Sequence, residues 1–264
     1  MQKLPETNKS LGQHWLTDAS ALGDIVDAAQ LSPVDTVVEI GPGPGTLTRL
    51  LVKQASQVIA VEFDAKLARE LPGRVTANNL RIVTQDILSF DFTAVPAPYK
   101  VVANIPYYLT SNLIRVLSES SNPPTTAVIL IQKEVAQRVT AAPGAMSLLS
   151  VTAQYYWETS LGALVPAELF TPPPKVDSQV LILQHRSKPQ FEDVDTKLFF
   201  QLVKAGFGQR RKTLLNSLSS GLRLDKTVIT SVCELANIDP KRRAQTLDLT
   251  EWNNLYQILQ TANT

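Results

Sequence analysis

The sequence predicts an α/β fold, in which helices cover a mostly parallel sheet, followed by a smaller helical domain. Two observations support this prediction. Short runs of apolar and β-branched residues alternate with amphipathic helical patterns up to about residue 131, which is typical of a parallel sheet. From Thr196 onward the apolar residues recur at helical spacing only, which indicates a separate part. We therefore expect one domain at residues 1–187 and a second at residues 188–264.

The individual elements follow from these two patterns. The expected strands occupy residues 36–40, 58–61, 80–83, 100–103 and 127–131, with a late pair at 148–158 and 178–183. The expected helices occupy residues 18–30, a stretch ending near 54, 65–71 and 110–118, and then segments around Leu198, Leu214 and Leu255. The prolines at 166 and 172–174 make the connection within the late pair a stiff loop. Ligands of open α/β sheets bind beyond the carboxyl ends of the strands.

The composition describes an ordinary globular chain. It has 264 residues, of which 44% are hydrophobic and 19% charged, and this suffices for a substantial core. The single cysteine gives no disulfide framework, the N-terminus lacks the apolar stretch of a signal peptide, and no apolar run approaches the roughly 20 residues of a membrane span. We therefore expect a cytoplasmic protein with no membrane partner. The two histidines, His14 and His185, lie in different segments, so no metal site is expected.

A glycine-rich loop at residues 39–45 lies between the first expected strand and a helix. Its glycines allow a sharp turn and a close approach of a ligand to the backbone, while Pro44 removes an amide that a dinucleotide pyrophosphate would use. Glu62 follows Gly41 by 21 positions, where a carboxylate can accept hydrogen bonds from ribose hydroxyls. Asp86, after the third strand, adds another acceptor. The alternatives are a structural turn and solvated acids.

The tetrapeptide Asn104-Ile105-Pro106-Tyr107 follows the fourth expected strand. An aromatic amine is a poor nucleophile, because its lone pair is delocalised into the ring. The Asn104 side-chain oxygen and the Ile105 carbonyl can accept its N–H bonds and aim the lone pair at a methyl donor. Pro106 fixes the backbone, and Tyr107 offers a flat face to an extruded base. A common Asn-x-Pro turn is the alternative interpretation.

The tetrapeptide resembles the Asn/Asp-Pro-Pro-Tyr motif of amino-group methyltransferases, in the form found in ribosomal RNA adenine methylases. Further segments resemble the small-subunit ribosomal RNA adenine dimethyltransferases (the KsgA family), and the resemblance covers nearly the whole chain. These segments are Lys9-Ser-Leu-Gly-Gln13, Glu39-Ile-Gly-Pro-Gly43, Gln132-Lys-Glu-Val-Ala-Gln-Arg138, Pro172-Pro-Pro-Lys-Val-Asp-Ser178 and Gln209-Arg-Arg-Lys-Thr-Leu214.

The resemblance implies a Rossmann-like methyltransferase with a seven-stranded, mostly parallel sheet and S-adenosyl-L-methionine as cofactor. It implies dimethylation of the N6 amines of two adjacent adenosines in the 3′-terminal hairpin of small-subunit ribosomal RNA. A role in late assembly of an immature small subunit is also implied, and we expect a monomer. The cofactor contacts carried over by position are His14, Leu16, Gly41, Gly43, Glu62, Asp86 and Asn104. Phe170 matches the aromatic residue that sandwiches the target base opposite Tyr107, with packing in the core as the alternative.

Two departures from the family pattern are expected to affect the site. The family usually reads Gln-Asn-Phe where this chain has Gln13-His14-Trp15, so His14 either remakes the contact of that Asn or leaves it to the backbone. The family often has Asn-Ile after the tetrapeptide, where this chain has Tyr108-Leu109. Tyr108 either narrows the target pocket or packs beneath it.

Basic residues in two compact clusters, with two others, are candidates for contacts with RNA phosphates. They are Lys133, Arg138, Arg210, Arg211, Lys212, Lys241, Arg242 and Arg243. A solvated charged face is the alternative, and the net charge of +1 does not by itself indicate a nucleic-acid partner. A helical face of this kind is expected to recognise RNA shape and backbone more than sequence.

Three other functions are compatible with parts of the pattern. The first is methylation of a large-subunit adenine, which confers antibiotic resistance and which the tetrapeptide does not distinguish. The second is an RNA-binding assembly or transcription factor without catalysis, which would not need the whole set of cofactor residues. The third is a nicotinamide-dependent oxidoreductase, which the proline-interrupted glycine loop disfavours.

Overall fold

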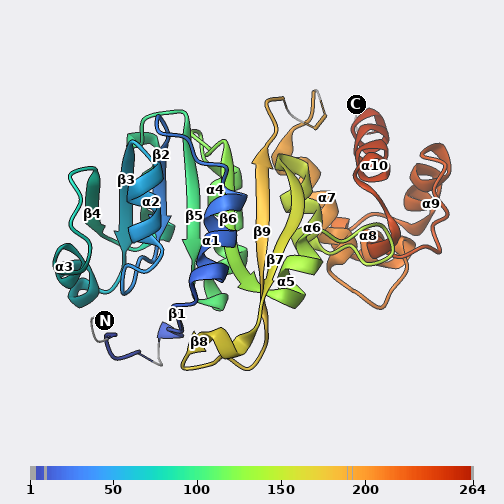
Figure 1. Ribbon diagram of the computed structural model, residues 1–264. Coiled ribbons are helices and arrows are strands. Elements are labelled where there is room, and N and C mark those ends of the chain that lie inside the picture. Colours follow the sequence, from blue (N-terminus) through green and yellow to red (C-terminus); the bar gives the residue numbers. More distant parts are fainter. Residues whose placement is uncertain (1–3, 9–10, 189, 192, 263–264) are drawn as a thin grey trace. The chain divides into compact units, whose positions relative to one another are not determined.

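The computed structural model describes residues 4–8, 11–188, 190–191 and 193–262. Two residues of the resembling segment at 9–13, Lys9 and Ser10, lie outside this range. The chain divides into two compact units (Figure 1). The first contains the residues up to Gln137 and Trp157–His185, and the second contains Arg138–Tyr156 and the residues from Arg186 onward.

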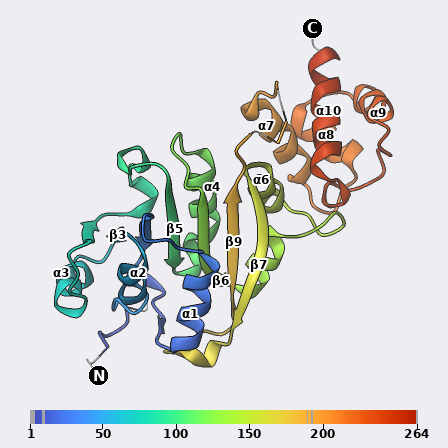
Figure 2. The same ribbon diagram turned by 45° about the horizontal axis from the view of Figure 1, so that its top comes forward.

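A seven-stranded sheet in the order β4-β3-β2-β5-β6-β9-β7 forms the centre of the first unit (Figures 1 and 2). The parallel strands are β2 (Thr36–Ile40), β3 (Gln57–Glu62), β4 (Leu80–Thr84), β5 (Tyr99–Asn104) and β6 (Thr126–Gln132). The antiparallel strands are β7 (Trp157–Val165) and β9 (Ser178–His185). The middle strands are almost wholly buried, which explains their continuous apolar runs. The expected mostly parallel sheet is confirmed.

Four helices lie where the sequence predicts them, α1 (Ala19–Ala28) before the parallel strands and α2 (Thr48–Gln54), α3 (Ala65–Arg74) and α4 (Thr110–Glu119) between them. Helix α5 (Lys133–Val139), after β6, was not predicted. The carboxylate of Asp18 accepts a hydrogen bond from the Ala21 amide and so caps α1, and Asp64 caps α3 in the same way. Apolar side chains of α1 and α2 form one buried cluster with alternate residues of the central strands.

A small second sheet lies where the parallel strands end (Figure 1). It joins β1 (Trp15–Leu16) to β8 (Phe170–Thr171) in antiparallel pairing, with Trp15 opposite Thr171 and Leu16 opposite Phe170. The sequence did not predict this pair, because each strand has two residues and gains its partner from about 150 positions away. The pairing holds the N-terminal segment beside the loop between β7 and β9.

The prediction of a strand at residues 148–158 is wrong. Residues Leu148–Tyr156 form helix α6, and β7 begins only at Trp157. The helix begins with a reciprocal cap, in which the Ser147 amide donates to the Ser150 hydroxyl oxygen and the Ser150 amide donates to the Ser147 hydroxyl oxygen. A short apolar run fits a buried helix as well as a strand, so periodicity alone did not separate them.

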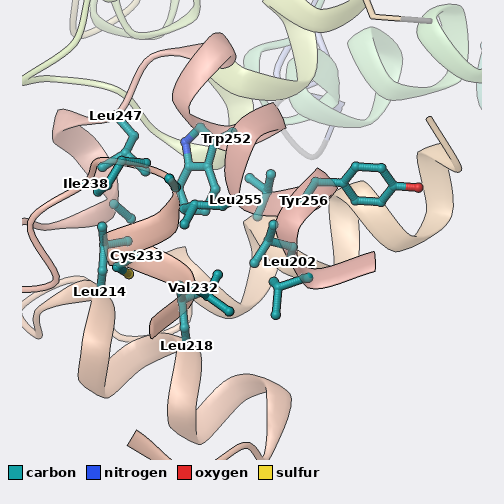
Figure 3. Packing of buried hydrophobic residues seen from close by; sticks show 14 of the residues in the cluster. Leu202, Leu214, Leu218, Val232, Cys233, Ile238, Leu247, Trp252, Leu255 and Tyr256 are labelled. Atoms are coloured by element: carbon teal, nitrogen blue, oxygen red, sulfur yellow. The ribbon is translucent and has the colours of Figure 1, made fainter. Parts of the chain in front are cut away.

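The second unit packs five helices around one apolar cluster (Figure 3). The helices are α6, α7 (Thr196–Phe207), α8 (Leu214–Leu222), α9 (Lys226–Leu235) and α10 (Leu249–Ala262). Trp252 is fully buried, and a Cβ at Gly206 would clash with its ring, so α7 and α10 approach closely only because residue 206 is glycine. The cluster includes Val151 and Tyr155 of α6.

The division into units therefore differs from the expected split after residue 187. The chain leaves the first unit at residue 186, next to the expected boundary, but residues 138–156 also belong to the second unit. The reason is the apolar face of α6, which is buried in the second cluster. Within the described ranges, no helix is long and apolar enough to cross a membrane.

Candidate active site

A cavity of about 250 Å³ lies in the first unit, at the carboxyl edge of the parallel strands. Its walls come from residues 11–16, the glycine loop, the ends of β3 and β5, the residues after β4, and β8. The cavity brings together all the catalytic and cofactor residues expected from the sequence. They are His14, Leu16, Gly41, Gly43, Glu62, Asp86, Asn104, Ile105, Pro106, Tyr107 and Phe170.

Glu62 ties the glycine loop to the end of β3. Its Oε2 accepts a hydrogen bond of 3.0 Å from the Gly43 amide, and its Oε1 accepts one of 2.9 Å from the Asp64 amide. The side chain is 6% exposed. Burial raises the pKa of Glu62, while the two amides oppose that rise. Each carboxylate oxygen retains a further lone pair, so both can still accept hydrogen bonds from a ligand.

The glycine loop passes beneath Trp15. Gly43 has φ of +52°, and a Cβ at this position would come within 2.8 Å of the Trp15 ring. The Trp15 indole is fixed in turn, because its Nε1 donates to the Pro5 carbonyl at 2.8 Å. Glycine is therefore required at 43 for two independent reasons, its backbone conformation and its contact with Trp15.

Glu39 is a cavity residue to which the sequence assigned no role of its own. It is 1% exposed, and within the described part of the chain neither carboxyl oxygen makes a well-formed hydrogen bond. Burial raises its pKa to about 8, the Thr48 hydroxyl opposes this, and the neighbouring Glu62 carboxylate adds to it. A cation entering the cavity would favour the ionised form of Glu39. Its signal in the sequence is a carboxylate inside an otherwise apolar strand.

Asp86 and Phe63 line the cavity on the side of β3 and β4. The Oδ1 of Asp86 accepts a hydrogen bond of 2.9 Å from the Leu88 amide, which fixes the carboxylate at the start of a short 3₁₀ turn. Phe63 directly follows Glu62, and its ring is 62% exposed. The Phe63 ring gives this side of the cavity a flat apolar surface, and the carboxylates of Glu62 and Asp86 give it hydrogen-bond acceptors. Phe63 was not among the site residues predicted from the sequence.

The tetrapeptide turns sharply from β5 towards α4. Asn104 is the last residue of β5 and is paired with Leu130 of β6. Residues Tyr107–Leu109 form a 3₁₀ turn, in which the Leu109 amide donates to the Pro106 carbonyl at 3.1 Å. The Asn104 and Tyr107 side chains therefore reach the cavity from a rigid strand end and a fixed turn. Hydrogen-bond acceptors and a flat aromatic ring at this part of the cavity are suited to bind an aromatic amine.

Comparison with known proteins decides the family. The sequence matches the model of a family described as ribosomal RNA adenine dimethylase over residues 5–255. The chain belongs to the ribosomal RNA adenine dimethylase family. It is accordingly a methyltransferase that uses S-adenosylmethionine and methylates adenine in ribosomal RNA, as the resemblance of its motifs implied.

Curated relatives of this dimethylase cover almost its whole length. A protein from Dehalococcoides mccartyi, named ribosomal RNA small subunit methyltransferase A, is 44% identical over 254 residues, which are 95% of this chain and 87% of the relative. A protein of the same name from Clostridioides difficile is 41% identical over 263 residues, which are 96% of this chain and 91% of the relative.

Solved structures confirm the Rossmann-like methyltransferase fold. A dimethyladenosine transferase from Plasmodium falciparum has a TM-score of 0.82 at 25% identity, with 95% of this chain and 98% of the other covered. The 23S rRNA methyltransferase ErmE has a TM-score of 0.76 at 29% identity, with 93% of this chain and 99% of the other covered.

The two departures of this dimethylase from the family pattern both lie at the cavity. The His14 Nδ1 donates to the Pro172 carbonyl at 2.7 Å, so His14 links the N-terminal segment to the loop after β8. The ring of His14 lies nearly parallel to that of Tyr107, at 19° and with centroids 6.5 Å apart. Tyr108 is 62% exposed, so it stands at the rim of the cavity and does not pack beneath it.

Phe170 is more buried than a freely stacking ring. It is 4% exposed, is paired with Leu16 and belongs to the apolar cluster under the sheet. It also lines the cavity. In this dimethylase Phe170 therefore has the packing role that the sequence left open, and its contact with a target base stays a prediction.

The two basic clusters of the dimethylase lie side by side in the second unit. The Leu214 amide donates to the Arg242 carbonyl at 2.7 Å, and the Leu215 amide donates to the Pro240 carbonyl at 3.1 Å. These bonds bring the turn before α8 against the loop before α10. The exposed side chains of the joined surface are Arg210, Arg211, Lys212, Lys241 and Arg243. Of the other two candidates, Lys133 is half-buried in the first unit, and Arg138 is exposed in the second.

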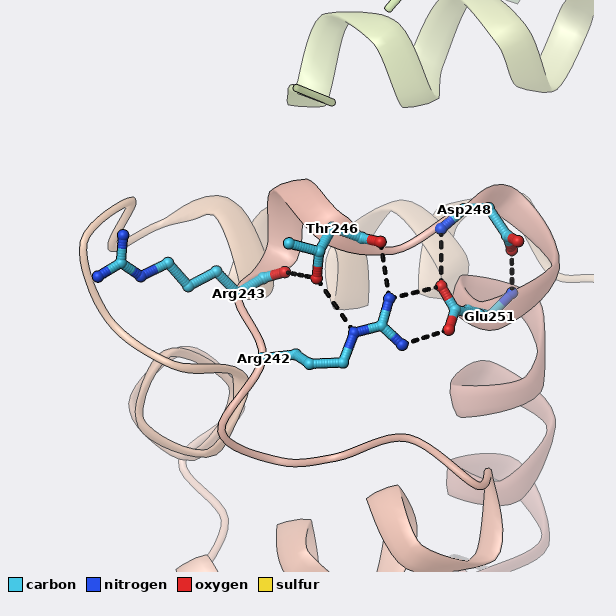
Figure 4. Close-up of polar contacts among 5 residues, drawn as sticks. All are labelled: Arg242, Arg243, Thr246, Asp248 and Glu251. Carbon is cyan, nitrogen blue, oxygen red and sulfur yellow. Dashed lines mark hydrogen bonds and ion pairs between the residues drawn. The ribbon is translucent and has the colours of Figure 1, made fainter. Parts of the chain in front are cut away.

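Arg242 has a different environment from its neighbours (Figure 4). Its guanidinium bonds both carboxylate oxygens of Glu251 and donates to the hydroxyl and carbonyl oxygens of Thr246. Four of its five N–H donors are thereby used within the protein. These contacts do not support the expectation that Arg242 binds RNA.

Proposed function

We propose that the protein transfers methyl groups from S-adenosylmethionine to the N6 amines of two adjacent adenosines in the 3′-terminal hairpin of small-subunit ribosomal RNA. The observation that carries this proposal is that the expected cofactor contacts and the tetrapeptide at 104–107 line one cavity. The chain that contains this cavity is 44% identical to a small-subunit methyltransferase. We also propose that the enzyme acts as a monomer in the cytoplasm, on an immature small subunit during late assembly.

The residues of the cavity fit the cofactor. The two oxygens of Glu62 can accept hydrogen bonds from the ribose hydroxyls, and Asp86 can accept one from the adenine amine. Gly41 and Gly43 allow the cofactor to approach the loop backbone, with Leu16 and His14 on the N-terminal side. When bound, S-adenosylmethionine supplies an electrophilic methyl group. The positive charges of the cofactor favour the ionised forms of Glu39 and Glu62. Burial otherwise raises the pKa of both side chains.

The tetrapeptide then orients the acceptor. The Asn104 side-chain oxygen and the Ile105 carbonyl accept the two N–H bonds of the target amine, and Tyr107 supports the base by stacking. Held in this way, the nitrogen lone pair would point at the methyl group that the cofactor supplies, and the amine proton would leave to water. The product nitrogen is acidic before that loss, so no strong general base is needed. Positioning and electrostatic complementarity therefore account for the rate.

The second unit supplies the proposed RNA contacts. Five exposed cations on two adjacent loops can neutralise phosphates without reading bases. Lys133 and Arg138 are proposed as further contacts. The expected helical RNA-binding domain at 188–264 is accordingly proposed in a larger form, with residues 138–156 included.

Methylation of a large-subunit adenine is the second candidate function, because ErmE shares the fold at 29% identity. The higher identity to small-subunit relatives over almost the whole chain favours the first candidate. The test is to incubate the protein and S-adenosylmethionine with purified immature small subunits or large subunits and to map modified nucleotides by mass spectrometry. Two adjacent dimethyladenosines near the 3′ end of the small-subunit RNA are expected. Modification of the large-subunit RNA alone would overturn the proposal.

A further inference from the structure

Tyr107 of the tetrapeptide is held at its far end by Ser178. The Tyr107 Oη and the Ser178 Oγ lie 2.8 Å apart. Burial raises the pKa of Tyr107, so the phenol stays neutral, and either hydroxyl can be the donor of this hydrogen bond. The contact joins two segments that are 71 positions apart in the sequence. It fixes the tip of a ring whose backbone end is fixed by the turn after β5.

Ser178 occupies a rigid position. It is fully buried at the start of β9, where it is paired with Gln132 of β6 on one side and Val165 of β7 on the other. The preceding residue is also held, because the Asp177 carbonyl accepts from the Lys133 amide and its Oδ1 accepts from the Ala167 amide. The hydroxyl that meets Tyr107 is therefore presented by the sheet itself and not by a loop.

The orientation of the Tyr107 ring matters for the reaction. A base stacked on this ring takes its plane from the ring, and the direction of the N6 lone pair follows from the plane of the base. The ring of His14 lies nearly parallel to that of Tyr107, but parallel rings can still slide past each other. The hydrogen bond at Oη restrains the tip of the ring against such sliding. The hydroxyl of Tyr107 thus has a function that a phenylalanine at this position could not supply.

We propose that Ser178 is a positioning residue for methyl transfer, which holds the Tyr107 ring in the orientation on which the target adenine stacks. The inference rests on the proposed function, because it takes Tyr107 as the platform for the base. RNA affinity comes mainly from phosphate contacts elsewhere, so loss of the Ser178 hydroxyl lowers kcat and leaves the KM for RNA nearly unchanged. The loss of one neutral hydrogen bond corresponds to a reduction of about tenfold.

The kinetic test compares Ser178→Ala, Tyr107→Phe and the double variant, with Ser178→Thr as the variant that retains a hydroxyl. Ser118→Ala is the matched control, since Ser118 is another buried serine of the first unit and its Oγ bonds Ile114 and Trp157 instead. We expect kcat to fall about tenfold in Ser178→Ala and in Tyr107→Phe, with no further loss in the double variant and partial recovery in Ser178→Thr. A normal kcat in Ser178→Ala, multiplying losses in the double variant, or an equal loss in Ser118→Ala would overturn the inference.

A second measurement is independent of the RNA substrate. The protein is labelled with 3-fluorotyrosine, and the Tyr107 fluorine signal is assigned by its absence in Tyr107→Phe. This signal should shift and broaden in Ser178→Ala and stay unchanged in Ser118→Ala. If the wild-type enzyme fails to methylate small-subunit RNA, the proposed function fails, and the fluorine signal alone then decides whether Ser178 holds the ring. An unchanged signal in Ser178→Ala contradicts the inference in either case.

Discussion

Arg242 and Glu251 form a two-pronged ion pair between the loop before α10 and the first turn of that helix. The Glu251 Oε2 also accepts from the Asp248 amide, and the Asp248 Oδ1 accepts from the Glu251 amide, so the pair is part of the helix cap. Both side chains are partly buried. The Arg242 guanidinium therefore stabilises the second unit. In the sequence it stands between two basic residues, Lys241 and Arg243, whose side chains are exposed.

Arg242→Ala is therefore expected to lower the free energy of unfolding by about 1 to 2 kcal/mol, because it leaves the Glu251 carboxylate without its partner. The measurement is urea unfolding at neutral pH. Arg243→Ala is the control and should change stability by less than about 0.5 kcal/mol, since its side chain is exposed. The hydrogen bond from Arg242 holds the pKa of Glu251 below its ordinary value of 4.5. This contribution is present above pH 4.5 and is lost as the pH falls through the lowered pKa.

Asn104→Ala should abolish methyl transfer and leave RNA binding within a few fold. The side-chain oxygen that orients the target amine is lost, whereas the phosphate contacts are made by other residues. The assays are radiolabelled methyl transfer to immature small subunits and a gel shift with the same RNA. Asn112→Ala changes an exposed asparagine on α4 and should leave both unchanged. Methyl transfer at the wild-type rate by Asn104→Ala would refute the role assigned to the tetrapeptide.

Gly43→Ala should weaken binding of S-adenosylmethionine at least about tenfold and destabilise the protein by about 1 to 2 kcal/mol. A Cβ at this position needs a left-handed backbone conformation and meets the Trp15 ring. Calorimetric titration and thermal unfolding measure the two effects. Gly23→Ala is the matched control, because this glycine lies inside α1 and an added Cβ would meet no neighbouring side chain among the described residues. It should stabilise the protein by about 0.5 to 1 kcal/mol. Equal behaviour of the two variants would contradict the role of the glycine loop.

Glu39→Gln should make stability less dependent on pH between about 5 and 8. The pKa of Glu39 in the folded protein is about 8, above the ordinary value of 4.5. Within this window the folded protein keeps a proton that the unfolded chain has lost, so the free energy of unfolding falls as the pH rises. The effect is on the order of a few kcal/mol across the window. Unfolding curves at four pH values, compared with those of the exposed control Glu168→Gln, test it; parallel wild-type and Glu39→Gln profiles would contradict it.

Charge reversal of Arg210 and Arg211 should weaken RNA binding about equally for all sequences and flatten its dependence on salt. Each phosphate contact that is lost reduces the slope of log affinity against log salt by about 1. The measurement is RNA affinity at several salt concentrations. Arg81→Glu places on the exposed side of β4 the same change of charge as a single reversal at 210, and so controls for net charge. If Arg81→Glu reduces the slope as much as a reversal at 210, the basic surface of the second unit is not the site of contact.

The sequence by itself determined the parallel sheet and the residues that gather at its edge. Strands alternating with helices must pair in parallel, and the carboxyl ends of parallel strands meet at one edge. The glycine loop, Glu62, Asp86 and Asn104 each lie at the end of such a strand or just after it, so their meeting in one cavity follows from their order in the chain. The backbone conformation of the tetrapeptide was equally predictable, because its proline and the strand before it restrict the backbone.

Only the tertiary structure decided the contacts between distant segments. Residues 148–156 are helical because their apolar face is buried against helices that begin about 40 positions later, which no local pattern reveals. Glu251 removes the side chain of Arg242 from the basic surface, whereas backbone bonds of Leu214 and Leu215 bring the turn with Arg210 against the loop before α10. The hydroxyl of Ser178 reaches Tyr107 only when β9 has inserted beside β6. Such pairings depend on packing and burial, and neither is encoded in the spacing of neighbouring residues.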